Sequence, residues 1–200
     1  MSRTRLVLTT LALALATAVP ARAATLKCPA DSVKAGNACI DKYEASVWGV
    51  DLQSKTGKFL IKKIEQGKAT LADLTKAGAI QLGCTDPPFT HFPLNFFFSD
   101  AGGTHLIPVE ETNFVAYAVS IPGVLPSTCV SWFQANELCA LSGKRLLRND
   151  EWQRAATGTP DPGTDNGTTD CNISTAGTPV NTGSRASCKS VWRAFDMVGT

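Results

Sequence analysis

Apolar and polar positions in the first half of the chain form short alternating runs separated by turn residues, a pattern typical of strands. Residues 40–48 alternate in this way, although not cleanly, and predict a strand. Residues 57–61 are expected to pair back on it as a hairpin, and residues 117–121 predict a further strand. Between them, Thr70 is a candidate N-cap for a short helix over residues 71–78.

Residues 126–158 predict two helices, and the first of them has signals at both ends. Ser131 and Gln134 stand at the N-cap and N3 positions of a capping box, and Gly143 stands where a left-handed C-cap residue belongs. The apolar residues of this helix lie roughly on one face, which we expect to be buried: Phe133, Ala135, Leu138, Cys139 and Leu141.

A short strand and a second helix are predicted to follow. Residues 145–147 read as the strand, and Asn149 is expected to cap the helix. Acidic residues, among them Glu151, stand in the first turn, where the helix macrodipole favours negative charge. Trp152 and Ala155 are expected to face the core.

Two long segments have neither the two-residue period of a strand nor the 3.6-residue period of a helix. Residues 84–109 combine prolines and a glycine pair with several phenylalanines, and they predict a long irregular loop. Residues 159–187 are rich in Thr, Gly, Asn, Asp and Pro and cannot bury much apolar surface. We therefore expect a disulfide or a metal ion to clamp the second loop.

The N-terminus has the pattern of a secretory signal. Two arginines precede an apolar run over residues 6–19, and residues 21–23 form a small-x-small cleavage site. The run is shorter than the roughly 20 residues of a spanning helix, which favours cleavage over an uncleaved membrane anchor. Residues 1–23 are thus predicted to be a signal peptide and the mature chain, residues 24–200, to be secreted to the periplasm or outside the cell.

Removal of the signal changes the charge of the protein. It takes away three arginines and no acid, so the formal net charge falls from +2 to −1. A chain with that balance has no overall electrostatic attraction to nucleic acid or to anionic lipid. We therefore expect no nucleic-acid partner and no membrane association after cleavage, and the mature length fits one domain.

All seven cysteines lie in the mature part, where an oxidising compartment makes disulfides the default expectation. Cys28 and Cys39 flank a Gly-Asn turn and are candidates for a short staple. Cys171 and Cys188 bracket the end of the second loop and are candidates for its clamp.

The pairing of the remaining three cysteines is predicted less completely. With a helix between them, Cys129 and Cys139 would stand roughly 15 Å apart, too far for a bridge. Cys84 could pair with either, and Cys139 is the better candidate for a buried, inert thiol. The chain has neither a CxxC nor an HExxH motif, and its two histidines, His91 and His105, stand apart, so no zinc or iron site is indicated.

Four segments, in order along the chain, resemble motifs of one family. Residues 39–44 read CIDKYE, close to CIDxYE, and residues 130–139 carry V-S-W-x-x-A-x-x-x-C. Residues 143–156 read GKRLLRNDEWQRAA, close to G-K-R-L-P-T-E-A-E-W-E-x-A-A. Residues 195–199 read FDMVG, the start of D-M-V-G-N-V-W-E-W.

Through these motifs residues 28–200 resemble the formylglycine-generating enzyme (sulfatase-modifying factor) family, while residues 51–125 match none of its motifs. The resemblance implies a C-type-lectin-like α+β domain with much irregular loop and bound calcium. Authentic members oxidise a sulfatase cysteine to formylglycine with oxygen and with copper held by a pair of cysteines. That pair lies downstream of N-V-W-E-W, so we expect this domain to be incomplete at its C-terminus, a fragment, and inactive by itself.

The resemblance also suggests a calcium site and partners. Asn172 and Ile173 resemble the Asn-Ile pair through which family members bind calcium, and their oxygens are the hard ligands that this ion prefers. Alternatively, Asn172 stabilises a turn beside Cys171. The partner of a full-length relative would be a sulfatase polypeptide.

A non-catalytic, exported lectin-like domain that binds a protein or a glycan is the alternative function, with the aromatic segment 89–98 as its binding surface. An iron enzyme of the ergothioneine-synthesis type shares the domain but needs a set of iron histidines. Since the chain offers only His91 and His105, we set that reading aside.

Overall fold

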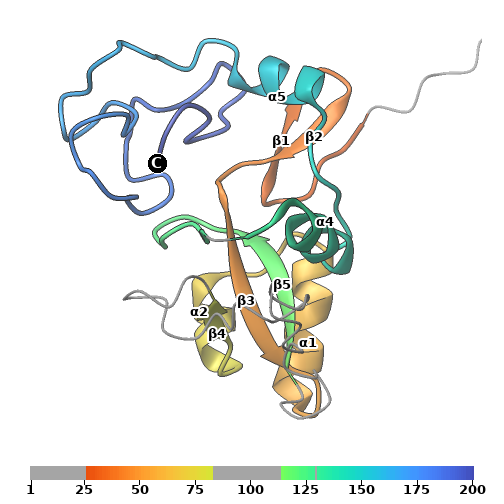
Figure 1. The fold of residues 1–200 in the computed structure, drawn as a ribbon. Coiled ribbons are helices and arrows are strands. Elements are labelled where there is room, and N and C mark those ends of the chain that lie inside the picture. Colours follow the sequence, from red (N-terminus) through yellow and green to blue (C-terminus); the bar gives the residue numbers. More distant parts are fainter. Residues whose placement is uncertain (1–25, 83–113, 129) are drawn as a thin grey trace, which may run out of the picture.

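The structure is a computed structural model and describes residues 26–82, 114–128 and 130–200 (Figure 1). The elements follow in the order β1 (Ser32–Ala35), β2 (Ala38–Asp41), β3 (Ala45–Asp51), α1 (Lys55–Glu65), α2 (Leu71–Lys76), β4 (Ile80–Leu82), β5 (Phe114–Ser120), α4 (Trp132–Leu141) and α5 (Asn149–Ala156). Helices and small antiparallel sheets together make an α+β architecture. The predicted signal peptide, the irregular segment 84–109 with its phenylalanines, and both histidines lie outside the described residues.

The described strands form two sheets. β1 and β2 pair as an antiparallel hairpin, with Val33 opposite Ile40. The second sheet has the order β4-β3-β5 and is antiparallel throughout, with Val47 opposite both Leu82 and Ala118. The strand predicted over residues 40–48 is therefore divided between the two sheets. It is interrupted at residues 42–44, where the backbone N–H of Lys42 donates to Asp31 and that of Tyr43 donates to the Ser120 hydroxyl.

The predicted return strand over residues 57–61 is wrong, because this segment lies inside α1. Ser54 caps the helix by accepting a hydrogen bond from the Gly57 backbone N–H at 2.8 Å. Leu60 and Ile64, four residues apart, form a buried face. A side chain at position 57 would meet the backbone oxygen of Asp51 at 1.9 Å, so the glycine permits the close turn into the helix. Burial of apolar residues that repeat with the 3.6-residue period of a helix therefore outweighs the strand-like composition of residues 57–61.

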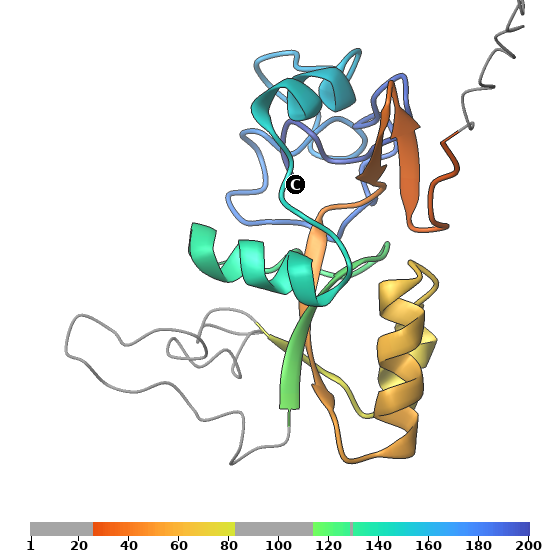
Figure 2. The same cartoon turned by 90° about the vertical axis from the view of Figure 1, so that its right-hand side faces the viewer.

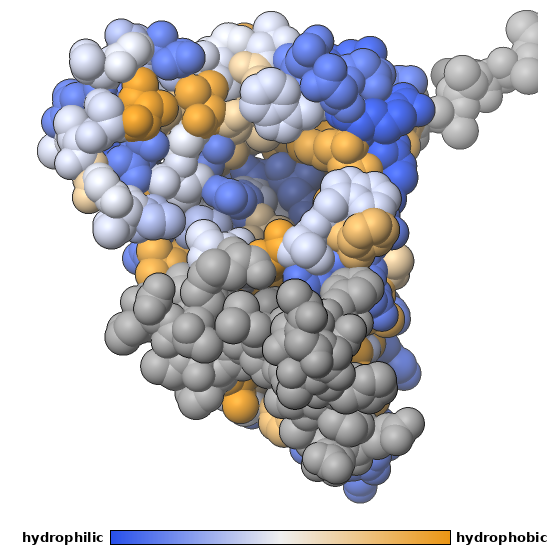
Figure 3. All heavy atoms as spheres, viewed as in Figure 1, coloured by the Kyte–Doolittle hydropathy of each residue, from blue (hydrophilic) through white to orange (hydrophobic). Residues whose placement is uncertain are grey.

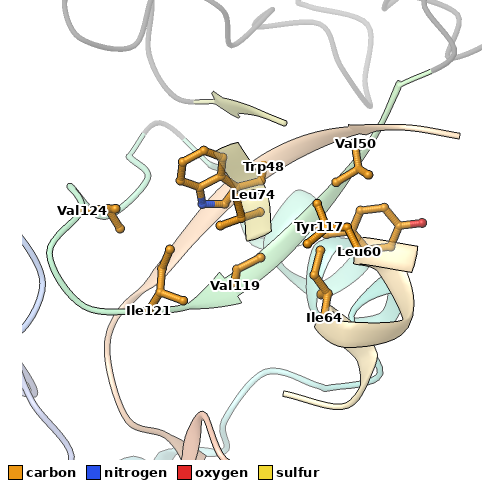
Figure 4. Packing of buried hydrophobic residues seen from close by; sticks show 9 residues of the cluster. All are labelled: Trp48, Val50, Leu60, Ile64, Leu74, Tyr117, Val119, Ile121 and Val124. Atoms are coloured by element: carbon orange, nitrogen blue, oxygen red, sulfur yellow. The ribbon is translucent and has the colours of Figure 1, made fainter. Parts of the chain in front are cut away.

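The core lies between the three-stranded sheet and the helices. Trp48 and Val50 of β3 point to one face, together with Tyr117 and Val119 of β5, where α1 and α2 contribute Leu60, Ile64 and Leu74 (Figure 4). The alternate residue Val47 points to the other face and packs with Leu138 of α4. The period of two along each strand thus places α1 on one side of the sheet and α4 on the other, as Figure 2 shows.

The signals at the ends of the helices are largely confirmed. Thr70 caps α2 in a capping box, Ser131 and Gln134 form the capping box of α4, and Gly143 has a φ of 71°. The predicted buried face of α4 is only partly correct. Leu138 is buried, but Phe133 is 65 % exposed, and the buried position one turn before Leu138 is held by Gln134.

The segment after α4 differs from the prediction in three respects. Residues 145–147 form no strand, because their backbone crosses between α4 and α5 without a strand to pair with. The N-cap of α5 is Arg148 rather than Asn149. The backbone N–H of Arg148 donates a hydrogen bond to the carboxylate of Glu151. Ala155 is fully buried against Ala35 and Ile40, but Trp152 is 45 % exposed.

Among the described helices, none has the length and apolar character that crossing a membrane requires.

Candidate functional site

A cavity of about 1120 Å³ lies where the β1–β2 hairpin, the connection from α4 to α5, and residues 195–200 meet. Figure 3 shows the hollow in this part of the molecule. Its lining combines three aromatic rings, from Tyr43, Trp152 and Phe195, with charged groups from several elements. Aromatic surface with a few polar groups is the usual make-up of a site that binds a small molecule or a peptide segment.

A half-buried lysine joins two walls of this cavity. Lys144 directly follows the helix-ending Gly143, and its ammonium donates to Asp31 at 2.5 Å and to Asp41 at 2.7 Å. Burial by itself would lower the pKa of Lys144, but the carboxylates of Asp41 and Asp31 outweigh burial and raise it. The lysine therefore stays charged and ties the end of α4 to the hairpin.

A second ion pair holds the connection to α5. The guanidinium of Arg145 donates through two nitrogens to the two oxygens of Glu151, at 2.6 and 2.7 Å. These hydrogen bonds, and that from the Arg148 backbone, lower the pKa of Glu151 to about 2. This two-pronged geometry is the strong form of an arginine–carboxylate pair, and it fixes the position at which Trp152 enters the cavity wall.

The third wall is formed by residues 195–200. The backbone N–H of Phe195 donates to Lys42 at 2.8 Å, and the Phe195 ring stacks on Tyr43 with centroids 5.2 Å apart. At the end of the segment, the Thr200 hydroxyl donates to the Glu44 carboxylate. The motif at residues 195–199 thus lies beside the segment 39–44, although the two are far apart in the sequence.

Asp196 is the unusual group of this wall. Its side chain lines the cavity, and the residue is only 8 % exposed. One carboxylate oxygen accepts a hydrogen bond from the Gly183 backbone at 2.7 Å, while the other has no partner among the described residues. Burial, with a contribution from Glu44, raises the pKa of Asp196 to about 6. The motif at residues 195–199 includes Asp196 but indicates no role for it, because burial of a single aspartate is not visible in a sequence.

The loop after α5 is clamped in two ways. Cys171 and Cys188 form a disulfide, with Cα atoms 4.5 Å apart. The carboxylate of Asp165 accepts six hydrogen bonds from backbone and hydroxyl donors of Gly167, Ile173, Ser174 and Thr175. These bonds hold the pKa of Asp165 well below its usual range, first through Thr175. The predicted disulfide is present in the structure, and an aspartate provides the second clamp.

The position of Asn172 bears on the predicted calcium site. Its side-chain nitrogen donates to the carbonyl oxygens of Thr178 and Thr200, at 2.9 and 2.8 Å, and so ties the loop to residues 195–200. Its side-chain oxygen accepts one long hydrogen bond, of 3.4 Å, from Ala176.

The charged side chains around Asn172 do not test the predicted calcium site, because calcium also binds backbone and amide carbonyl oxygens. The oxygens of Asn172 and Ile173 are neutral, and the Asp165 carboxylate beside them is already taken by N–H and O–H donors. No group of three or more acidic, histidine or cysteine side chains suited to a metal occurs in the described part of the chain. Since calcium takes six to eight oxygens, the site at Asn172 and Ile173 stays a prediction.

The described cysteines do not offer a copper site. Cys28 and Cys39 form the second predicted disulfide, with Cα atoms 5.4 Å apart. Cys139 has a free thiol and lines the cavity, and burial, aided by Asp41, raises its pKa. A protonated, single thiol is a poor ligand for Cu(I), which binds thiolates. Cys84 and Cys129 lie outside the described residues.

Comparison with known protein families identifies the family of this α+β domain. Residues 32–194, most of the chain, match the sulfatase-modifying factor enzyme 1-like domain, so the protein belongs to the formylglycine-generating enzyme (sulfatase-modifying factor) family. The resemblance predicted from four short motifs is thereby confirmed. A search of curated proteins found no match, and neither did a search of solved structures.

Proposed function

We propose that this protein is an exported member of the family that binds a polypeptide or glycan in the cavity and that its chain, residues 24–200, does not itself oxidise cysteine. The observation that carries the second part is the state of the cysteines. Four are joined in two disulfides, and Cys139 carries a thiol that burial keeps protonated. The family reaction needs a pair of cysteines for copper, and the described residues offer none.

Incubation of residues 24–200 with Cu(I), oxygen and a sulfatase peptide that contains the target cysteine tests the catalytic part. Mass spectrometry of the peptide measures conversion to formylglycine, with an active member of the family as positive control. We expect no conversion. Turnover by the protein would refute the proposal, and the variant Cys139→Ser would then show whether that thiol takes part.

The cavity supports the binding part of the proposal. Trp152 is 45 % exposed, and Tyr43 and Phe195, which stack on each other, also line the cavity. Exposed aromatic rings next to charged and hydroxyl groups suit a ligand that is apolar on one side and polar on the other, as sugars and peptides are. We also propose that the domain has a C-type-lectin-like fold, in which variable loops on a fixed scaffold hold the partner.

The binding proposal is tested with Trp152→Ala and a matched control. Trp192 is another surface tryptophan, 36 % exposed, and it does not line the cavity. Screening of immobilised glycans and of a sulfatase polypeptide with the unaltered protein provides the ligand for comparison. We expect Trp152→Ala to weaken its binding at least tenfold and Trp192→Ala to leave it unchanged. Equal effects of the two substitutions on binding would contradict a binding site in this cavity. Failure of the unaltered protein to bind any of the glycans or the sulfatase polypeptide would contradict it as well.

Export and calcium are parts of the proposal with direct tests. N-terminal sequencing of the protein secreted from its host is expected to begin at Ala24, and an uncleaved terminus would contradict export with cleavage. For calcium, thermal melting is compared in calcium and in chelator. A melting temperature that rises with calcium and loses this dependence in Asn172→Ala supports the predicted site, while equal curves refute it.

A further inference from the structure

The outer face of α1 has a concentration of positive charge that the fold does not use. Lys55, Lys58 and Lys62 are all exposed, and Phe59 between them is 61 % exposed. We call these four residues the lysine stripe. Residues three and four apart share one face of a helix, so the stripe runs along two turns, about 10 Å. Leu60 and Ile64 point the other way, into the core (Figure 4).

Within the described part of the protein, the stripe lacks ion pairs, although Glu65 follows Lys62 by three residues on α1. None of its three lysines forms an ion pair there, whereas the neighbouring Lys63 pairs with Asp73. The first turn of α1 contains no acid. Lys55 and Lys58 therefore lie near the positive end of the helix macrodipole, and Lys58 also repels Lys62 one turn on. An external anionic surface would relieve both costs.

We propose that the lysine stripe binds the anionic headgroups of a lipid surface. The choice of residue favours a diffuse anionic surface over a single carboxylate. α1 has four lysines and no arginine, although arginines are frequent between residues 145 and 193. Lysine acts as a flexible point charge, while recognition of one carboxylate in a protein partner usually employs the two-pronged arginine.

The exposed phenylalanine is consistent with the same ligand. An exposed aromatic ring beside basic residues can contact the headgroup region while the lysines meet the anionic headgroups, because aromatic side chains favour the membrane–water interface. The ammonium of Lys63 lies 5.2 Å from the ring centre of Phe59 and helps to hold the ring at the surface. The helix lies at one edge of the described fold (Figures 1 and 2).

The net charge of the mature chain, −1, predicts no overall attraction to such a surface. Attraction by a local stripe is compatible with that value, because salt screens charges that lie farther away than about 8 Å at physiological ionic strength. The protein would bind in one orientation, with α1 toward the lipid, and the association would weaken as salt is added.

Sedimentation with vesicles tests the proposal on residues 24–200. Vesicles of phosphatidylcholine alone are compared with vesicles containing phosphatidylglycerol, at low and at high salt. Each lysine near an anionic surface strengthens binding about fivefold. We therefore expect the unaltered protein to bind only the anionic vesicles, and the variant Lys55→Glu/Lys58→Glu/Lys62→Glu to bind at least tenfold more weakly. This variant should fold, because all three positions are exposed and two of the new acids, at positions 55 and 58, lie near the N-terminus of α1, although the third lies in its last turn.

The matched control is Lys27→Glu/Lys34→Glu/Lys76→Glu, which makes the same change in net charge at other exposed positions. Its binding is expected to fall by less than threefold. Phe59→Ser is expected to weaken binding by a factor that does not depend on salt. Equal losses in the two triple variants, or no binding of the unaltered protein to anionic vesicles, would overturn the proposal. Binding to polyglutamate without binding to vesicles would also overturn it and indicate an acidic protein partner.

Discussion

Replacement of Asp196 by asparagine is expected to stabilise the protein, and to do so only above the pKa of the buried acid. Asparagine keeps an oxygen that can accept the hydrogen bond from Gly183. It removes the charge that the fold holds at 8 % exposure with one oxygen unpaired. The charged form is the one that burial disfavours, so its removal should raise the free energy of unfolding.

The size of the effect follows from the pKa. Folding raises the pKa of Asp196 from 3.8 to about 6. Each unit corresponds to about 1.4 kcal/mol, so the full shift sets an upper limit of about 3 kcal/mol. Since the full shift is an upper limit, we expect about 1 to 3 kcal/mol. For a domain of this size, each kcal/mol moves the melting temperature by roughly 2–4 °C.

The pH dependence gives the sharper test. An acid with a raised pKa in the folded state contributes stability that is fully present below pH 3.8 and is lost as pH rises through about 6. The difference between Asp196→Asn and the unaltered protein should therefore be close to zero at pH 4 and reach its full value at pH 8.

Urea unfolding at both pH values, followed by circular dichroism, measures this difference. Asp161→Asn removes an equal charge at an exposed position and serves as the control. An asparagine variant less stable than the unaltered protein at pH 8 would refute the reasoning and show that a partner holds the charged carboxylate. A difference of equal size at both pH values would also refute it.

Three further substitutions test the scaffold of the site. Lys144→Met leaves Asp31 and Asp41 without their shared cation and should cost about 1–3 kcal/mol in urea unfolding at pH 7, below the cost for a fully buried pair because the side chains of Lys144 and Asp41 are 18 % and 29 % exposed. Lys34→Met at the surface should cost little, and equal losses would contradict a structural role for Lys144. Cys171→Ser/Cys188→Ser removes a bridge between cysteines 17 residues apart and should cost about 3 kcal/mol, and an unchanged unfolding midpoint would mean that the Asp165 hydrogen bonds suffice as a clamp. Leu138→Ala, in the face of α4 that packs on the sheet, should lower the free energy of unfolding by about 2–5 kcal/mol. Trp132→Ser, at a position that is 66 % exposed, should change it by less than about 0.5 kcal/mol. A larger loss from Trp132→Ser than from Leu138→Ala would contradict the side of α4 that is described as buried.

Local chemistry in the sequence was sufficient to predict several features of the fold. The N-cap at Thr70 and the capping box at Ser131 depend on residues within one turn of each other, so their pattern is visible in a short window. The same holds for Gly143 at the end of α4 and for the two cysteine pairs, which are 11 and 17 residues apart. Family membership could also be predicted, because each motif is a short contiguous segment with a particular order of residue types.

Local patterns failed where burial by distant segments decided the outcome. Residues 57–61 became part of a helix because Leu60 and Ile64 are buried against the sheet, a contact that no short window contains. On α4, the sheet lies against Gln134 and Leu138, so Phe133 is left at the surface, although its apolar character predicted burial.

The candidate site is almost wholly a product of tertiary structure. Lys144 meets Asp31 and Asp41 across more than one hundred positions of sequence, and Phe195 stacks on Tyr43 across a still longer separation. The free energy of these contacts depends on distance and burial, and both are set only when the hairpin, the α4–α5 connection and residues 195–200 pack together. The sequence by itself determined the N-caps of α2 and α4, the disulfide candidates and the family. The tertiary structure decided which charges are buried, which remain exposed on α1, and where the cavity lies.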